Sequence, residues 1–202
     1  MSLSVTQFGK PIPKEKYTWD EETKVFSSKE SNLVIQCYVE HTTFTTGRNC
    51  TFITGDNCIF NTSYGCDFNT GHGCTFDTGS DCTFATGNNC SFDTGYNCTF
   101  ATGSDCIFKT GNSCIFKTSN DCIFNTSHDC TFTTGTGCII VRRDIFEVIR
   151  IPKKTTIKLN NIKGFIKIKS NKTITINNIT IEVSAEQFDM LLKNNLICIR
   201  SN

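Results

Sequence analysis

Apolar and polar positions alternate through the middle of the chain in a pattern that restarts every eight residues. From residue 42 to residue 138 the unit reads C-x-F-x-T-G-x-x, with cysteine, phenylalanine and threonine two residues apart. Successive side chains of a β-strand point to opposite faces, so this spacing puts these three residues on one face and the variable residues on the other. The pattern predicts one short strand in every unit.

Two rows of the repeat are predicted to form the structural core ladders. The first position holds cysteine at Cys50, Cys58, Cys66, Cys74, Cys82, Cys90, Cys98, Cys106, Cys114, Cys122, Cys130 and Cys138. The third position holds phenylalanine at Phe44, Phe52, Phe60, Phe68, Phe76, Phe84, Phe92, Phe100, Phe108, Phe116, Phe124 and Phe132. The earliest unit is incomplete, with Thr42 in the cysteine position.

The last three positions of the unit predict a tight corner. The sixth position is glycine in nine of twelve units and serine in the others, and the eighth is always Asn, Asp, Gly or Ser. We expect this segment to supply residues that tolerate the positive φ of a sharp turn.

A strand and a corner repeated with nothing between them predict an all-β fold, a β-solenoid of the parallel β-helix or β-roll kind. One unit cannot bury its phenylalanine alone, whereas coils stacked about 4.8 Å apart can bury the whole row. We favour two repeats per coil, with two facing sheets and the phenylalanines between them. A one-repeat coil is the alternative; its lumen is too small for phenylalanine, so the row would need a dimer to cover it. An antiparallel meander ranks third.

Both ends of the repeat predict caps for the exposed strand edges. Residues 1–41 predict an N-terminal arm, residues 1–13, followed by a capping hairpin around Glu21 and Glu22. Residues 139–202 predict a β-rich cap or oligomerisation domain with short strands at 145–151, 155–159, 165–169, 173–176 and 179–183. A helix is expected over 185–194, where Phe188, Leu191 and Leu192 form one apolar face and a candidate oligomer contact.

Net charge is distributed unevenly between the repeat and the two ends of the chain. The net charge is +1 overall, but it is −1 over residues 1–41, −5 over 42–138 and +7 over 139–202. An acidic middle and a basic end favour head-to-tail contacts or a protein partner for the C-terminal part. The chain starts without the apolar segment of a secretory signal and has no apolar run long enough to span a bilayer. We therefore expect a cytosolic protein with reduced thiols, no membrane partner and no nucleic-acid partner.

The cysteine row is the strongest candidate for chemistry. Cysteines on neighbouring strands come within reach of disulfide formation, and zinc binding between coils is conceivable. However, the repeat has none of the C-x₂₋₄-C knuckles that structural zinc sites use, so we favour buried thiols with no metal and no cofactor. The histidines His41, His72 and His128 have no evident acid or nucleophile partner, and no catalytic site or enzyme activity is predicted.

The octad, for example CTFDTGSDCTFATGNNC, resembles the Cys-Phe-Thr-Gly octapeptide-repeat proteins of mimivirus-like giant DNA viruses. The following segment VRRDIFEVIRIPKKTTIKLN is similar to the one that follows the repeats in those proteins. The resemblance covers about residues 42–160. It implies a viral protein made in host cytoplasm, in a virus factory or the virion, and transfers no functional residues.

The sequence therefore favours a non-enzymatic structural scaffold that binds proteins and self-associates, with a dimer as the expected homo-oligomer. Two functions from other classes stay open. One is a thiol-rich redox or zinc-binding protein, and the other is an acidic rod that mimics DNA and inhibits a DNA-binding enzyme.

Overall fold

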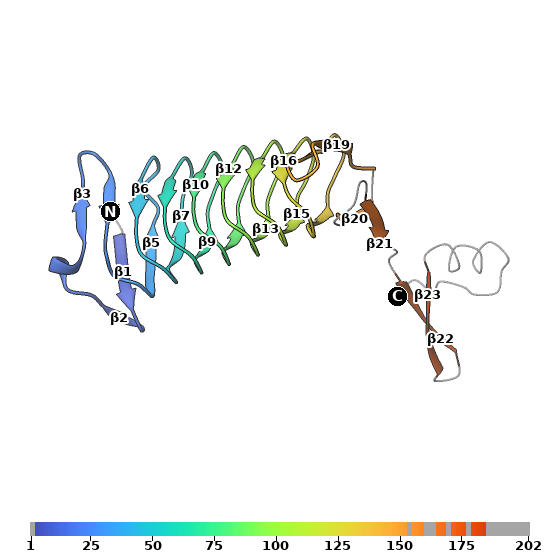
Figure 1. The fold of residues 1–202 in the computed structure, drawn as a ribbon. Helices are drawn as coiled ribbons and strands as arrows, with labels where there is room; N and C mark the ends of the chain where they lie inside the picture. Colours follow the sequence, from blue (N-terminus) through green and yellow to red (C-terminus); the bar gives the residue numbers. More distant parts are fainter. Residues whose placement is uncertain (1–2, 153–154, 160–164, 169–170, 177–178, 185–202) are drawn as a thin grey trace. The chain divides into compact units, whose positions relative to one another are not determined.

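The computed structural model describes residues 3–152, 155–159, 165–168, 171–176 and 179–184. The chain divides into two compact units, Met1–Ile166 and Lys167–Asn202. In the first unit the repeats form a series of stacked coils, so the predicted β-solenoid is confirmed (Figure 1). Its described part is almost entirely strand and corner, with one short 3₁₀ helix at Lys14–Lys16.

Each coil contains two repeats and adds one strand to each of two parallel sheets. Sheet A takes in order β5 (Leu33–Cys37), β7 (Thr51–Thr54), β9 (Asp67–Asn69), β11 (Thr83–Ala85), β13 (Thr99–Ala101), β15 (Ile115–Lys117) and β17 (Thr131–Thr133). Sheet B takes β4 (Val25–Ser27), β6 (Thr43–Thr45), β8 (Ile59–Asn61), β10 (Thr75–Asp77), β12 (Ser91–Asp93), β14 (Ile107–Lys109), β16 (Ile123–Thr126) and β18 (Ile139–Arg142).

Strand register settles the number of repeats per coil. Phe52 on β7 pairs with Phe68 on β9, and the intervening Phe60 pairs with Phe76 in the other sheet. Residues in register are therefore 16 apart, as the two-repeat coil requires. The 16-residue register excludes the one-repeat coil, and the parallel pairing excludes the antiparallel meander.

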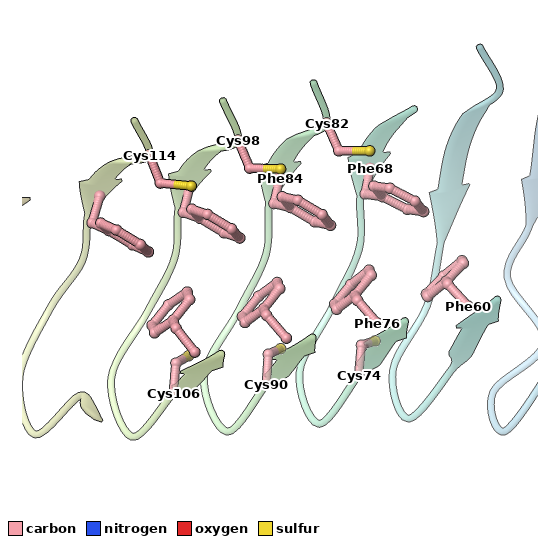
Figure 2. Packing of buried hydrophobic residues seen from close by; sticks show 14 of the residues in the cluster. Phe60, Phe68, Cys74, Phe76, Cys82, Phe84, Cys90, Cys98, Cys106 and Cys114 are labelled. Atoms are coloured by element: carbon pink, nitrogen blue, oxygen red, sulfur yellow. The ribbon is translucent and has the colours of Figure 1, made fainter. Parts of the chain in front are cut away.

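The core is made of two stacks of phenylalanine rings that face each other across the coil (Figure 2). Within a stack the rings of Phe84 and Phe100 are nearly parallel, with centroids 4.8 Å apart and an interplanar angle of 3°. Between the stacks Phe84 meets Phe92 edge to face, at 5.2 Å and 79°. Every phenylalanine and cysteine of the two predicted ladders is at most 2% exposed. The predicted inner face is therefore confirmed.

The N-terminal cap contains one predicted element and one that the sequence missed. Strands β3 (Thr18–Asp20) and β4 form the expected antiparallel hairpin around Glu21 and Glu22. The expectation that residues 1–13 form an arm is wrong, because β1 (Leu3–Gln7) pairs antiparallel with β5 and buries Val5. β1 thereby covers the backbone groups that the first coil would leave unpaired. The two-residue strand β2 (Lys10–Pro11) follows it.

The coils extend beyond the octapeptide repeat at both ends. Phe26 on β4 lies in register with Phe44, and Ile35 on β5 lies in register with Phe52. At the other end Ile140 on β18 takes the phenylalanine position beside Phe124. The predicted boundaries at 42 and 138 therefore mark the repeat in the sequence and not the first and last coils.

The strands predicted after the repeat are present within the described residues. β19 (Glu147–Arg150) and β20 (Thr156–Leu159) pair antiparallel with β18 and β17, which caps both sheets, and β21 (Phe165–Ile168) follows β20 in sheet A. In the second unit β22 (Asn171–Ile176) and β23 (Ile179–Ser184) form an antiparallel hairpin. The helix predicted over 185–194 lies outside the described residues.

Candidate interaction surface

The cysteine ladders lie at the start of each strand and point into the coil (Figure 2). Each thiol lies close to backbone carbonyls, as where Cys98 Sγ donates towards Tyr96 O at 3.5 Å and Gly79 O at 3.7 Å. In the part of the chain that the structure describes, every cysteine is a buried free thiol. The ladders are thus part of the core packing, in agreement with the predicted thiol ladder.

Burial and neighbouring thiols shift the pKa values of these cysteines in opposite directions. Burial raises the pKa of Cys37. The neighbouring thiols Cys50 and Cys82, together with burial, raise the pKa of Cys66, whereas the hydrogen bond with Cys66 lowers the pKa of Cys50 to about 6. A thiol held in the protonated form, such as that of Cys37, is a poor nucleophile and a poor metal ligand. Among the described residues, no group of three or more His, Cys, Asp or Glu side chains is placed to hold a metal ion.

The corners add a ladder of polar side chains that the sequence did not reveal. At five successive corners from sheet A to sheet B, the side chain of the middle residue accepts a hydrogen bond from a backbone N–H of the next coil. Asp56 Oδ1 accepts from His72 N at 2.8 Å, and His72 Nδ1 accepts from Asn88 N at 2.9 Å. The acceptors of this corner ladder are Asp56, His72, Asn88, Ser104 and Asn120, and Thr136 ends it as the last donor. The residue types vary, so the repeat pattern hides the shared acceptor role.

His72 and His128 therefore have identifiable partners, although they lie at separate corners. His72 belongs to the corner ladder. His128 Nδ1 lies 2.8 Å from Asp129 Oδ2, so the expectation that His128 has no acid partner is wrong. The pair forms because Asp129 has a positive φ of 59°, the left-handed conformation of a corner. Both side chains are about two-fifths exposed, which makes the pair a weak surface contact.

The outer face of sheet B carries an apolar patch near its C-terminal end. Ile107, Ile123 and Ile139 are successive partners in register, and Val141 pairs with Val148 on β19. We call these five residues the sheet B patch. Ile107 is 54% exposed and Val148 is 67% exposed. A row of outward β-branched residues forms a flat apolar surface, whereas scattered single residues would be ordinary.

Charged residues flank this patch on the N-terminal side. Asp93 lies in register between Asp77 and Lys109, and Lys109 Nζ lies 2.5 Å from Asp93 Oδ2. The contact is more than half exposed, so it adds little stability. It does offset the repulsion between the two stacked carboxylates, and it marks the boundary between the acidic and the apolar parts of sheet B.

The remaining predicted contact cannot be placed, since Phe188, Leu191 and Leu192 lie outside the described residues. In the described part of the chain no helix has the length and apolar character needed to cross a membrane. No family model, curated protein or solved structure matches the chain. The resemblance to giant-virus octapeptide-repeat proteins therefore depends on the repeat motif and on the segment that follows it.

Proposed function

We propose that this protein is a non-enzymatic scaffold that binds other proteins through the outer faces of its solenoid and self-associates as a dimer. The repeat motif supports an origin in a giant DNA virus, with synthesis in host cytoplasm and a place in a virus factory or the virion. The confirmed β-solenoid is consistent with this role, because its interior is filled by side chains and its outer faces are free to vary.

The sheet B patch is the observation that carries the proposal. Soluble monomers rarely leave a large contiguous apolar surface in water, so such a surface indicates an interaction site. The outer strands β1, β3, β19 and β20 pair with the first and last coils, so the backbone of these coils is already hydrogen-bonded and the faces are the surfaces that the proposal uses. A second copy can cover the patch by presenting the same patch about a two-fold axis.

Light scattering of purified full-length protein tests self-association. We expect the wild type to be a dimer and the Ile123→Lys variant to be a monomer, since a charge at the centre of the patch must lose its water in the interface. Lysine is tolerated outward in neighbouring coils at Lys109 and Lys117, so the variant should fold normally by circular dichroism. Thr83→Lys, on the outer face of sheet A, is the matched control and should stay dimeric.

Two results would contradict this assignment. A monomeric wild type would remove the dimer from the proposal, and a dimer that persists in Ile123→Lys while dissociating in Thr83→Lys would move the contact to sheet A.

A further inference from the structure

A second surface feature lies at the corners that lead from sheet B to sheet A. Tyr64 and Tyr96 occupy the middle position of two such corners, two coils apart, and are 44% and 53% exposed. Between them, on the intervening coil, are the small residue Ser80 and the carboxylate of Asp81. Together with Ser63 and Gly79 these residues line a groove of about 340 Å³. We call this groove the tyrosine slot.

The slot is open between the tyrosines because Ser80, at the intervening corner, has a small side chain. Ser80 Oγ accepts a hydrogen bond from the backbone N–H of Tyr96 at 3.1 Å, which directs the small side chain along the corner. Coils spaced about 4.8 Å apart put the two tyrosine positions about 9.6 Å apart. A group held midway would thus lie about 4.8 Å along the solenoid from each tyrosine position, a spacing that fits the roughly 6 Å range of a cation–π contact.

The chain already contains the type of contact that this slot could make. The Arg48 guanidinium lies over the Tyr64 ring on the N-terminal side, with its carbon 5.7 Å from the ring centroid. Arg48 also donates a hydrogen bond to the Tyr64 hydroxyl at 2.6 Å. One side of Tyr64 therefore holds a guanidinium in the free protein, and the side facing Ser80 and Tyr96 borders the empty groove.

The charges around the slot favour a cation. Asp81 is the only charged residue among those that line it. Asp77 lines the adjoining groove next to Ser63, whereas Asp93 is already paired with Lys109. Residues 42–138 carry a net charge of −5, which steers cationic groups towards this part of the protein.

We propose that the tyrosine slot receives an arginine side chain of a partner protein, stacked between Tyr64 and Tyr96 with its N–H groups donated to Asp81. Arginine suits the site better than lysine, because its planar guanidinium stacks on aromatic rings and forms two parallel hydrogen bonds with a carboxylate. The inference rests on the proposed function that the solenoid binds proteins, and it gives the chemistry of one such partner.

The test uses N-acetyl-arginine amide as the probe and the full-length protein. Ring signals of the tyrosines are followed by NMR during a titration. We expect saturable shifts of Tyr64 and Tyr96 with no shift of Tyr38, which is exposed at a different corner. N-acetyl-citrulline amide has nearly the same shape without the charge and should produce no saturable shift. Added salt should weaken arginine binding.

Matched variants locate the site. Tyr96→Ser should weaken arginine binding about two- to fivefold, the expected contribution of one exposed cation–π contact. Asp81→Asn should weaken it by a similar factor while keeping the corner, because asparagine holds the same left-handed conformation at Asn97. Tyr38→Ser and Asp105→Asn make the same changes away from the slot and should bind as the wild type does.

Equal shifts with the arginine and citrulline probes, or unchanged binding by Tyr96→Ser, would overturn the proposal. The Ile123→Lys variant separates this result from the scaffold proposal, because it disrupts the proposed dimer without touching the slot. It should bind the arginine probe as the wild type does. If the tyrosine signals of this variant no longer shifted on addition of the probe, arginine binding would depend on the dimer contact. The proposal of a separate binding site in the tyrosine slot would then be refuted.

Discussion

The amide oxygen of Asn88 occupies the space that a side chain at residue 103 would need. A Cβ atom at Gly103 would lie 1.9 Å from Asn88 Oδ1, on the preceding coil. Asn88 cannot easily give way, because the same oxygen accepts the backbone N–H of Ser104 at 2.9 Å. Gly103 does not have a positive φ, so the glycine is required for close packing between coils and not for its backbone conformation.

This relationship predicts a non-additive pair of substitutions. Gly103→Ala should lower the free energy of unfolding by about 1–3 kcal/mol through overpacking, and Asn88→Ala by about 1 kcal/mol through loss of its hydrogen bond. The free energy of unfolding of the double variant should fall by clearly less than the sum of the two single losses, since removing the Asn88 amide makes room for the new methyl group. Urea unfolding of the four proteins measures the coupling. Additive losses would show that the two residues act independently.

The same pair shows where the sequence is informative and where it is not. Strand faces and the two-repeat coil follow from the period-two spacing and the size of phenylalanine, and both were confirmed. The eighth position was also predicted correctly, because residues such as Asn97 and Asp105 have positive φ. The prediction that the sixth position also needs a positive φ was wrong. At Gly103 a Cβ is excluded by a contact with a residue on another coil.

Features that depend on how the coils stack could not be predicted from the sequence. The corner ladder is built from different residue types that share an acceptor, so no motif marks it. The tyrosine slot exists because Tyr64 and Tyr96 are 32 residues apart, a spacing that becomes meaningful only once the coil has 16 residues. β1 pairs with β5 only when the first coil has closed and exposed an edge.

A substitution in the middle of the ring stacks should have a local effect. Phe84 stacks on Phe68 and Phe100, with centroids 4.9 and 4.8 Å away. We expect Phe84→Ala to reduce the free energy of unfolding by about 3–5 kcal/mol through the cavity it leaves. Because coils interact with nearest neighbours, hydrogen exchange should accelerate more in β9 and β13 than in β5 or β18.

The control for this substitution is Phe8→Ala. The Phe8 side chain is 81% exposed, so its removal should change the free energy of unfolding by less than about 0.5 kcal/mol. Equal acceleration of exchange in every coil of Phe84→Ala would contradict the nearest-neighbour description and indicate that the solenoid unfolds as one unit.

Threonines of the inner face differ in how well their hydroxyl groups are satisfied. Thr94 Oγ1 is buried without a hydrogen-bond partner. Thr126 Oγ1 donates to Gly111 O at 2.9 Å and accepts from Thr110 Oγ1 at 3.0 Å. Thr94→Val should therefore raise the free energy of unfolding by about 1 kcal/mol, and Thr126→Val should lower it by about as much. Thermal or urea unfolding would measure both, and a destabilised Thr94→Val would show that its hydroxyl has a partner.

The Cys37 thiol should contribute a loss of stability in alkaline solution. Burial raises the pKa of Cys37 above its ordinary value of 9.0. Below that value the thiol is protonated in both states and the free energy of unfolding does not depend on it. Above it, the thiol loses its proton first in the unfolded chain, which favours unfolding. The difference in urea midpoint between the wild type and Cys37→Ala should therefore be constant up to about pH 8 and change in favour of the variant above about pH 9. This difference isolates Cys37 from ladder thiols whose pKa is lowered, such as Cys50. A change in favour of the wild type would contradict a raised pKa of Cys37.

The C-terminal end of the core contains a buried arginine in place of a threonine, paired with a carboxylate at the surface. Arg142 lies in register with Thr126 and is fully buried. Its Nε and Nη2 donate to the two carboxylate oxygens of Asp144, at 3.2 and 2.6 Å, and Nη1 lies 3.9 Å from Glu147 Oε2. Hydrogen bonds from Arg142 lower the pKa of Asp144 below its ordinary value of 3.8.

This pair should stabilise the fold above pH 4 and fail in acid. A carboxylate with a lowered pKa contributes its stability above the pKa of the unfolded chain, and loses it as the pH falls through the pKa of the folded state. Asp144→Asn should lower the free energy of unfolding at pH 7 by about 1 kcal/mol, because the guanidinium loses one charged partner that is itself at the surface and keeps Glu147 nearby. The variant should also show a shallower loss of stability between about pH 4 and pH 2 than the wild type.

Replacing both residues, as Arg142→Met with Asp144→Asn, should recover much of the loss at pH 7, since no arginine is then buried. If Asp144→Asn alone matched the wild type at every pH, Glu147 would be the partner that stabilises Arg142.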